Sequence, residues 1–378
     1  MDTTRFEGMR PYYDEEVPAA MQRIAAHPSF PVLSSFLYPD RPVEEVRKLF
    51  TSFRNISDFQ LNAMKAFNEQ VISQTITEFT YSGVEKIDPS KRYLFVSNHR
   101  DIVLDSSLMQ YVLYLNGHDT TEITFGANLM QGQLLIDFGK SNKMFRVERA
   151  GVTPRDFYNS SLLLSDYIRY TLLDKRQSVW IAQRNGRTKD GIDRTDQGIV
   201  KMFGMSRTDD RVASLAELNI MPVSVSYEWE PCDVLKALEL YVTKSGGTYI
   251  KKPGEDLNSI LTGLTQPKGR MHIQFCDPVT EEDLRAFDDV PNVQFHRKVA
   301  NLLDRRICSA FRLTPNNYIA HDLRYGQRAF ADKYTDEQMV AFDDRLESLN
   351  KYQDADPELL KDIFLGIYAN PIAVPVAE

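Results

Sequence analysis

The chain has 378 residues, of which 42% are hydrophobic and 26% charged, a balance that indicates a globular protein with one large or two modest domains. Its formal net charge of −8 disfavours a dedicated nucleic-acid-binding protein, so we expect no nucleic-acid partner. The sequence has no run of about 18 or more uninterrupted apolar residues and therefore predicts no membrane-spanning helix.

The cysteines Cys232, Cys276 and Cys308 lie far apart and form no Cys-x-x-Cys pair. This spacing supports neither a disulfide framework nor a structural zinc site, and it favours the reducing environment of the cytoplasm. The first residues lack a basic start followed by an apolar run, so we expect no signal peptide.

Residues 1–90 are predicted to form an N-terminal helical region. Apolar residues recur there at intervals of three and four in 18–24, 43–50 and 56–79. The prolines Pro28, Pro31, Pro39 and Pro42 separate the first segment from the second. The region shows no residues that indicate chemistry. We interpret most of its aromatic side chains as core.

Residues 91–320 are predicted to form an α/β domain, because short buried strands alternate with helical patterns. This alternation favours a mixed, largely parallel central sheet flanked by helices. Residues 321–378 are predicted to be a C-terminal helical extension. The expected strands are 93–96, 122–126, 143–149, 178–182, 220–227 and 271–276. The expected helices are 104–115, 129–138, 154–173, 295–311, 321–334, 336–351 and 357–368.

One histidine, His99, occupies a position that favours chemistry. It follows the expected strand at 93–96 and precedes a helix, which places it at the sheet edge where ligands bind in open α/β folds. A carboxylate that accepts a hydrogen bond from the Nδ1–H of a histidine leaves Nε2 free to take a proton from a hydroxyl. Such a pair needs no serine when the nucleophile is the substrate's own alcohol, as in direct acyl transfer from a thioester.

Two carboxylates, Asp101 and Asp105, are candidates for the partner of His99. Asp105 can serve only if residues 100–102 remain outside the helix, because neighbouring helical positions differ by about 100° in direction. The run that begins with Asp105 resembles a helix start, so we favour Asp105. In the alternative interpretation Asp105 is only a helix cap and His99 only a turn residue. A metal site at His99 and Asp101 would lack a nearby second histidine.

A long polar loop with three glycines, residues 183–198, follows the expected strand at 178–182. Such a loop directly after a buried strand is uncommon unless it is functional. Its residues Arg184, Arg187 and Lys189 suit a phosphate or carboxylate, and glycines let the backbone approach such a ligand. The alternative is a solvated charged loop.

Four segments in this order resemble the motif blocks of the glycerolipid acyltransferase superfamily, which contains glycerol-3-phosphate and 1-acylglycerol-3-phosphate acyltransferases. They are Asn98–Asp105, Phe145–Arg149, Gly186–Gly191 and Met221–Glu228. Two later segments, Phe275–Pro278 and Thr314–Ala320, look most like the bacterial glycerol-3-phosphate acyltransferase branch.

The resemblance implies catalytic and substrate-binding roles for particular residues of these blocks. His99 would be the catalytic base, and Asp105 would be the carboxylate that orients it. Two departures stand out: five residues separate His99 from Asp105 where the family has four, and Asn185 replaces the glutamate of the third block. The residues expected to bind substrate are Arg146, Arg149, Asn185, Gly186, Arg187, Thr188 and Pro222.

The resemblance also implies an acyltransferase that transfers groups other than amino-acyl groups. The expected reaction moves a fatty acyl group from acyl-CoA or acyl-carrier protein to the hydroxyl of glycerol-3-phosphate, a lysophospholipid or a similar acidic lipid precursor. No metal or other cofactor is expected, because a thioester is already activated. We expect these donors and lipid acceptors as partners, a role in phospholipid biosynthesis and a cytoplasmic location, with a peripheral contact on the inner face of the membrane left open.

Two alternative functions remain at this point. One is a catalytically weak protein that binds lipids or an acyl carrier on the same fold. The other is a thioesterase-like hydrolase that uses the same residues to activate water. Formation of an acyl ester, free acid or no product distinguishes the three.

Overall fold

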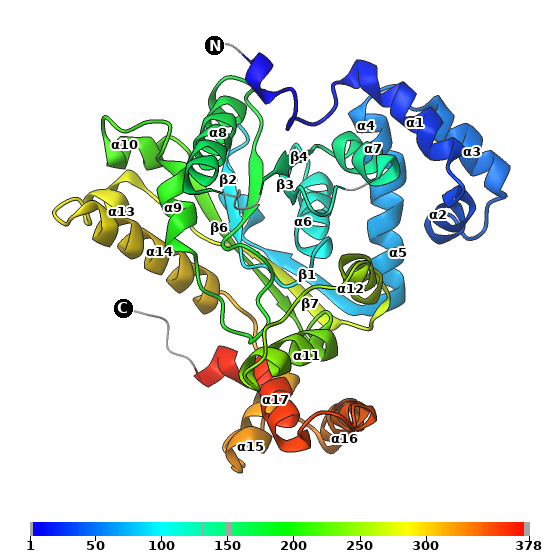
Figure 1. Ribbon diagram of the computed structural model, residues 1–378, viewed down its shortest axis with the longest axis vertical. Helices are drawn as coiled ribbons and strands as arrows, with labels where there is room; N and C mark the ends of the chain where they lie inside the picture. Colours follow the sequence, from blue (N-terminus) through cyan, green and yellow to red (C-terminus); the bar gives the residue numbers. More distant parts are fainter. Residues whose placement is uncertain (1–2, 131, 149–152, 374–378) are drawn as a thin grey trace.

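The computed structural model describes residues 3–130, 132–148 and 153–373. Seven strands in this part of the chain form one sheet, in the order β1-β7-β6-β2-β5-β3-β4 (Figure 1). The strand pairings are parallel except that between β6 and β7. The predicted α/β fold with a mixed, largely parallel sheet flanked by helices is confirmed. The strands are β1 (Ile76–Ser82), β2 (Leu94–Ser97), β3 (Glu122–Gly126), β4 (Met144–Val147), β5 (Val179–Ala182), β6 (Ile220–Tyr227) and β7 (Gly269–Phe275).

The prediction of helix up to Phe79 is wrong for its last residues. Helix α5 ends at Thr75, and β1 follows at once and pairs in parallel with β7. Ile76, Thr77 and Tyr81 are β-branched or aromatic, and such residues favour strands.

The predicted domain boundaries stay predictions. The N-terminal helical elements are η1 (Thr4–Phe6), η2 (Asp14–Glu16), α1 (Val17–Ala26), α2 (Phe30–Leu37), α3 (Val43–Ser52), α4 (Ile56–Phe59), the π-helix η3 (Gln60–Met64), α5 (Lys65–Thr75) and η4 (Val84–Lys86).

The core is divided between the two faces of the sheet, because neighbouring side chains of a strand point to opposite faces. In β2, Phe95 packs with the N-terminal helices and α6, whereas Leu94 and Val96 pack with α8, α9 and α14. Figure 1 shows these two groups of helices on either side of the sheet. The further helices of this part are α6 (Leu104–Leu115), α7 (Gln133–Ser141), α8 (Pro154–Leu173), α9 (Gln197–Phe203), α10 (Arg211–Ala216), α11 (Asp233–Lys244), α12 (Glu255–Thr265), α13 (Glu281–Arg285) and α14 (Asn292–Ser309).

Some predicted elements have the observed bounds and others are shifted. Helix α8 and strand β6 span the predicted 154–173 and 220–227. Helix α8 starts at a capping box, in which the hydroxyl of Thr153 accepts a hydrogen bond from the amide of Asp156. Helix α7, predicted from residue 129, begins at Gln133.

The C-terminal helices form a third core cluster, centred on aromatic residues such as Phe342 and Phe364. The predicted helix at 321–334 is wrong in both bounds. Gly326 has φ +61°, a left-handed conformation that glycine adopts readily, and its amide donates a hydrogen bond to the carbonyl of Asp322. This left-handed residue ends α15. These elements are α15 (Pro315–Tyr325), α16 (Asp336–Glu347), η5 (Ser348–Lys351) and α17 (Pro357–Ala373).

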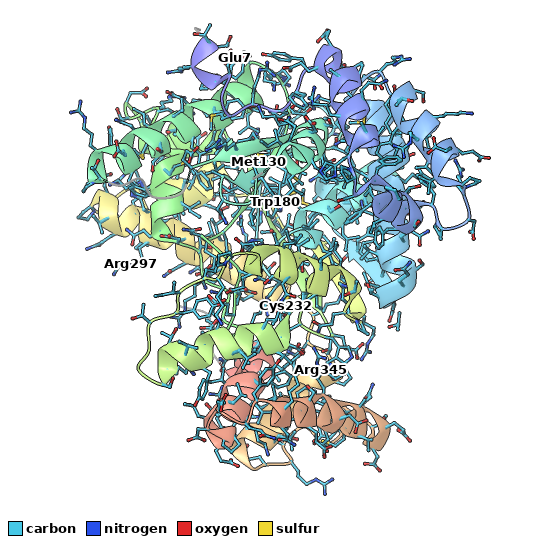
Figure 2. The ribbon with its side chains drawn as sticks, turned by 45° about the vertical axis from the view of Figure 1, so that its right-hand side comes forward. Glu7, Met130, Trp180, Cys232, Arg297 and Arg345 are labelled. Carbon is cyan, nitrogen blue, oxygen red and sulfur yellow. The ribbon has the colours of Figure 1, made fainter. Side chains whose placement is uncertain are left out.

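The C-terminal helices are tied to α11. The guanidinium of Arg345 donates a hydrogen bond of 3.0 Å from Nε to the carboxylate of Asp233 at the start of α11. Figure 2 shows Arg345 below Cys232, the residue that precedes this helix. None of the helices in the described residues is long and apolar enough to cross a membrane.

Candidate active site

The candidate site is built at the turn between β2 and α6. The chain leaves β2 after Ser97, and α6 begins only at Leu104, so residues 100–102 stay outside the helix. Nδ1 of His99 lies 2.9 Å from Oδ2 of Asp105. The turn therefore absorbs the extra residue of this block, as the preference for Asp105 requires.

The carboxylate of Asp105 is fully buried and fixed by three further donors. Its Oδ2 accepts hydrogen bonds from the backbone amides of Arg100 at 2.6 Å and Asp101 at 2.9 Å. Its Oδ1 accepts a hydrogen bond of 2.9 Å from the hydroxyl of Tyr227 at the end of β6. Burial and the neighbouring carboxylate raise the pKa of Tyr227 well above its ordinary value. The phenol therefore keeps its proton and donates a hydrogen bond to Asp105.

Asp101 has a different role from Asp105. Its Oδ1 accepts hydrogen bonds of 2.8 Å from the amides of Val103 and Leu104, which caps the start of α6. Its Oδ2 is buried and has no hydrogen-bond partner among the described residues. Asp101 thus shapes the turn, whereas Asp105 contacts His99.

The polar loop after β5 packs directly against this turn. The amide of Thr188 donates a hydrogen bond of 2.7 Å to the carbonyl of His99. The carboxylate of Asp193 accepts hydrogen bonds of 2.7 Å from the hydroxyl of Thr188 and 2.8 Å from the side-chain amide of Asn98. Thr188 and Asp193 are buried, so the alternative of a solvated charged loop does not hold for this part of it.

Beneath the turn lies a buried network of two cations and two anions. The Arg100 guanidinium donates to Asp193 at 2.7 Å and to Glu230 at 3.1 Å. The Lys236 ammonium donates to Glu230 at 2.6 Å and to the backbone carbonyl of Arg100 at 2.7 Å. Burial alone would lower the pKa of Arg100, but the two carboxylates raise it, so the arginine stays charged. Each charge is paired, which is the condition for burying it.

His99 borders a pocket of about 290 Å³ at the carboxyl ends of β3, β4 and β5. Its side chain is 15% exposed, and its ring meets Trp180 edge-on with centroids 6.1 Å apart. The pocket is mostly apolar, with a polar edge from the loop after β5. Its walls include Ile102, Thr124, Phe125, Leu129, Val147, Phe157, Leu164, Ala182, Ile199 and Met202, and its polar edge includes Arg184, Asn185, Gly186 and Asp196.

The structure brings some of the predicted substrate-binding residues to His99. Asn185 and Gly186 line the same pocket, and Thr188 bonds to the backbone of His99. Arg146 lines an adjoining hollow of about 300 Å³ and pairs with Glu148 at 2.8 Å. Arg149 lies outside the described residues.

Two predicted residues lie away from the pocket wall. Pro222 is inside the sheet, opposite Val96 of β2, and its carbonyl accepts a hydrogen bond from Cys276. Arg187 is 9% exposed, and its Nη1 is buried without a hydrogen-bond partner among the described residues. It lies close to Cys232: burial raises the pKa of that thiol, and the guanidinium partly offsets this effect.

Sequence reasoning gave Tyr227 and Asp193 no role of their own within the fourth motif block and the polar loop, and it assigned none to Glu230 or Lys236. A signal existed for Tyr227, because a buried tyrosine usually has a partner for its hydroxyl. The positions of Glu230 and Lys236 follow no strand or helix periodicity that marks them as a pair. Among the described residues, no group of three or more histidine, cysteine, aspartate or glutamate side chains is arranged to hold a metal ion. The expectation of no cofactor stays a prediction.

Comparison with known proteins identifies the class. Residues 78–226, less than half of the chain, match the family model described as Acyltransferase. This part contains the His99 block and nearly all of the four predicted motif blocks, so the resemblance to glycerolipid acyltransferases is confirmed there and the protein is an acyltransferase. Among solved structures, a 1-acyl-sn-glycerophosphate acyltransferase, PlsC, from Thermotoga maritima is similar at 13% identity and a TM-score of 0.34, covering 79% of this chain and 97% of that one. No curated protein matches the chain.

The bond from Tyr227 to Asp105 predicts the effect of Tyr227→Phe. Removing the hydroxyl leaves Oδ1 of a buried carboxylate without its donor, a change that typically costs about 1.5–3 kcal/mol. We expect acyl-transfer turnover to fall roughly tenfold or more and the pH profile of turnover to shift, together with a fall of a few degrees in the melting temperature. Tyr93→Phe is the matched control, because it removes another buried hydroxyl, which accepts from Asp88, away from His99. Equal losses in both variants would contradict the assignment.

Proposed function

We propose that this protein transfers a fatty acyl group from an acyl-CoA or acyl-carrier-protein thioester to the hydroxyl of glycerol-3-phosphate, a lysophospholipid or a similar acidic lipid precursor. The observation that carries this proposal is the pairing of His99 Nδ1 with the buried Asp105 carboxylate beside a largely apolar pocket. The family match supports acyl transfer in general. The choice of these donors and acceptors rests on the motif blocks.

His99 acts as a general base in this scheme. Asp105 accepts a hydrogen bond from the Nδ1–H of His99 and holds the ring, so Nε2 takes the proton of the acceptor hydroxyl as its oxygen attacks the thioester carbonyl. The tetrahedral intermediate then collapses, the carbon–sulfur bond breaks, and the imidazolium returns the proton to the leaving thiolate. The products are an acyl ester and a free thiol. The thioester is already activated, so the scheme calls for no metal or other cofactor.

The pocket walls suit the acyl chain. Phe125 belongs to β3, Leu129 follows it, and Leu164 comes from α8, so apolar side chains surround the space next to His99. Burying each methylene of an acyl chain against such walls contributes about 0.8 kcal/mol. The polar residues at one edge of the pocket suit the polar, reacting ends of the donor and the acceptor.

Arg187 is the strongest candidate for the anionic group of the acceptor. A buried guanidinium with an unpartnered nitrogen is costly unless an anion completes its bonding. Its neighbour Thr188 bonds to the backbone of His99, whereas the Arg187 side chain lies by Cys232, so an anion bound there would lie outside the wall of the His99 pocket. Arg146 and Arg149 are further candidates, because both belong to the second motif block, Phe145–Arg149, which begins within β4. Asn185, in place of a glutamate, offers an amide to the acceptor instead of a charge.

A peripheral contact with the inner face of the membrane belongs to the same proposal. Phe157 and Tyr158, in the first turn of α8, are 55% and 56% exposed, and Phe157 also lines the His99 pocket. Exposed aromatic residues at the mouth of a lipid site suit the membrane interface. We place the reaction in phospholipid biosynthesis, on the cytoplasmic side of the membrane.

The proposal is tested by incubating the protein with labelled acyl-CoA or acyl-carrier protein and a panel of acceptors. We expect an acyl ester with an acidic acceptor, whereas free acid would indicate a hydrolase and no product a binding protein. Positioned general bases contribute about 10²–10⁴-fold, so His99→Ala should lose at least that factor with little change in melting temperature. Near-normal turnover in a folded His99→Ala protein would refute the role of His99.

The two carboxylates near His99 give a second prediction. Asp105→Asn should lower turnover by roughly 10²–10⁴-fold, because the amide no longer stabilises the imidazolium. Asp101→Asn keeps an oxygen that can cap α6 and should retain most of the turnover. Steady-state rates with thermal melts for both variants decide the matter. Loss in Asp101→Asn alone would reverse the assignment, and normal rates in both would exclude the pair mechanism.

The third prediction concerns Arg187→Lys, which keeps the charge but removes the two-pronged fork. We expect a raised KM for the acceptor with a nearly constant KM for the donor. Arg194→Lys, an exposed arginine of the same loop, is the control and should change neither constant. A change confined to the donor KM would mean that Arg187 serves the phosphates of the donor instead.

A further inference from the structure

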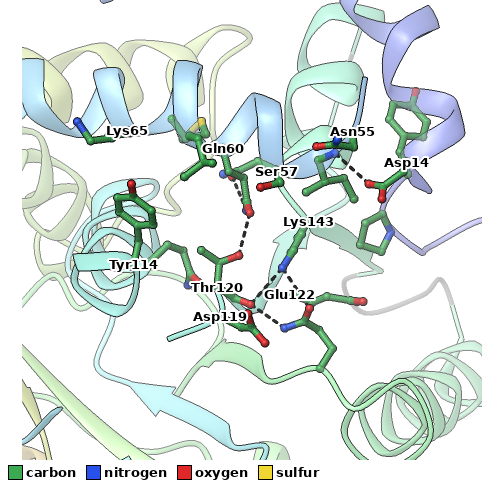
Figure 3. Close-up of a pocket in the computed structure, with 18 of the residues that line it drawn as sticks. Asp14, Asn55, Ser57, Gln60, Lys65, Tyr114, Asp119, Thr120, Glu122 and Lys143 are labelled. Atoms are coloured by element: carbon green, nitrogen blue, oxygen red, sulfur yellow. Dashed lines mark hydrogen bonds between the residues drawn. The ribbon is translucent and has the colours of Figure 1, made fainter. Parts of the chain in front are cut away.

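A large cavity in the described part of the chain lies away from His99. It has a volume of about 790 Å³ and is formed by the N-terminal helices, α6 and the segments that precede β3, β4 and β5 (Figure 3). The opposite ends of these three strands border the His99 pocket. At about 3.3 Å per residue, strands of four or five residues separate the two cavities by roughly 13–17 Å. The cavity is therefore a separate site.

Lys143 stands out in the wall of this cavity. It follows the C-terminal end of α7 and has φ +58°, a left-handed conformation usually occupied by glycine at this position. Figure 3 shows Lys143 between the segment that carries Thr120 and the segment that carries Gln60. A lysine here keeps a backbone conformation that costs free energy, which is a reason to look for a function of its side chain.

The ammonium of Lys143 has no carboxylate partner within ion-pair distance in the described part of the chain. It donates to the carbonyl of Thr120 at 3.3 Å and to the side-chain oxygen of Gln177 at 3.1 Å, both neutral groups. Burial lowers the pKa of Lys143. One of its three N–H donors has no partner from these bonds. The other two lysines of the cavity, Lys65 and Lys175, are each paired with a glutamate.

The rest of the wall suits a hydroxylated molecule. Hydroxyl and amide side chains lie on both sides of the cavity, and two carboxylates, Asp14 and Asp119, add acceptors for hydroxyl groups. Tyrosine rings give flat apolar surfaces between these polar groups. The neutral polar residues and tyrosines in the wall include Asn55, Ser57, Gln60, Thr120, Asn142, Gln177, Tyr13, Tyr111 and Tyr114.

We propose that this cavity binds a small phosphorylated sugar or polyol, whose phosphate accepts a hydrogen bond from Lys143 and whose hydroxyl groups meet the polar wall. Among the lysines that line the cavity in the described part of the chain, Lys143 is the one that is not paired with a glutamate. The carboxylates Asp14 and Asp119 accept hydrogen bonds from sugar hydroxyls. A cavity of 790 Å³ has room for a molecule of this size.

Calorimetric titration of the full chain tests the proposal, with glucose 6-phosphate, glucose and inorganic phosphate as probes. We expect saturable binding of glucose 6-phosphate that is tighter than binding of either other probe. Lys143→Gly removes the ammonium and suits the left-handed backbone, so it should weaken this binding roughly ten- to hundredfold. Ser57→Phe, which fills part of the cavity without touching the bonds of Lys143, should also weaken this binding by roughly tenfold or more.

Two control variants separate this site from its surroundings. Lys65→Gln removes a lysine that is already paired with Glu69, and Arg187→Lys alters the other candidate anion site. Both should bind glucose 6-phosphate as the unaltered protein does. The proposal is overturned if glucose 6-phosphate does not bind, if it binds no tighter than glucose, or if binding persists in both Lys143→Gly and Ser57→Phe. Binding lost in Arg187→Lys but kept in Lys143→Gly would assign the phosphate to the His99 region instead.

Discussion

The geometry around His99 depends on one buried carboxylate, Asp193. Asp193 lies 95 residues after Asn98 in the sequence, yet it accepts hydrogen bonds from Asn98, Arg100 and Thr188 at once. A carboxylate removed from water is stable only while such partners are in place. The turn after β2 and the loop after β5 must therefore take up their conformations together. The carbonyl of His99 is held as part of this arrangement, because the amide of Thr188 bonds to it.

The same electrostatic pairing extends to the C-terminal helices, which are thus more than an addition to the sheet. Glu230 pairs with Arg100, and its backbone amide donates to the hydroxyl of Tyr368 on α17. The side chain of Asn370 donates a hydrogen bond of 2.7 Å to the carbonyl of Asp190 in the loop after β5. Gly191 adopts φ +77° so close to α17 that a Cβ atom would lie 2.1 Å from the carbonyl oxygen of Ile367. The loop that borders the pocket is therefore held between the His99 turn on one side and α17 on the other.

Local sequence patterns predict those parts of the structure that depend on neighbouring residues. The bounds of α8 and β6 follow from hydrophobic periodicity and end signals, and the contact between His99 and Asp105 follows from helix geometry. The pattern could not show that β1 joins the sheet beside β7, because the partner strand is almost two hundred residues away. The bond from Tyr227 to Asp105 spans 122 residues and is invisible for the same reason. The sequence pattern placed Arg187 in a substrate-binding loop but could not show its burial beside Cys232, because that residue comes 45 residues later in the chain.

Strands β3, β4 and β5 connect two chemically different ends of the molecule. Their carboxyl ends border an apolar pocket that contains His99, and the segments before their amino ends border a polar cavity that contains Lys143. Side chains of the strands between them are close-packed, so the sheet is a stiff connection with little room for movement. A molecule bound at the amino ends would therefore stabilise the folded sheet by mass action without displacing His99. Because the two cavities share strands but no lining residues, the polar wall around Lys143 can differ in composition without altering the contacts that orient the base.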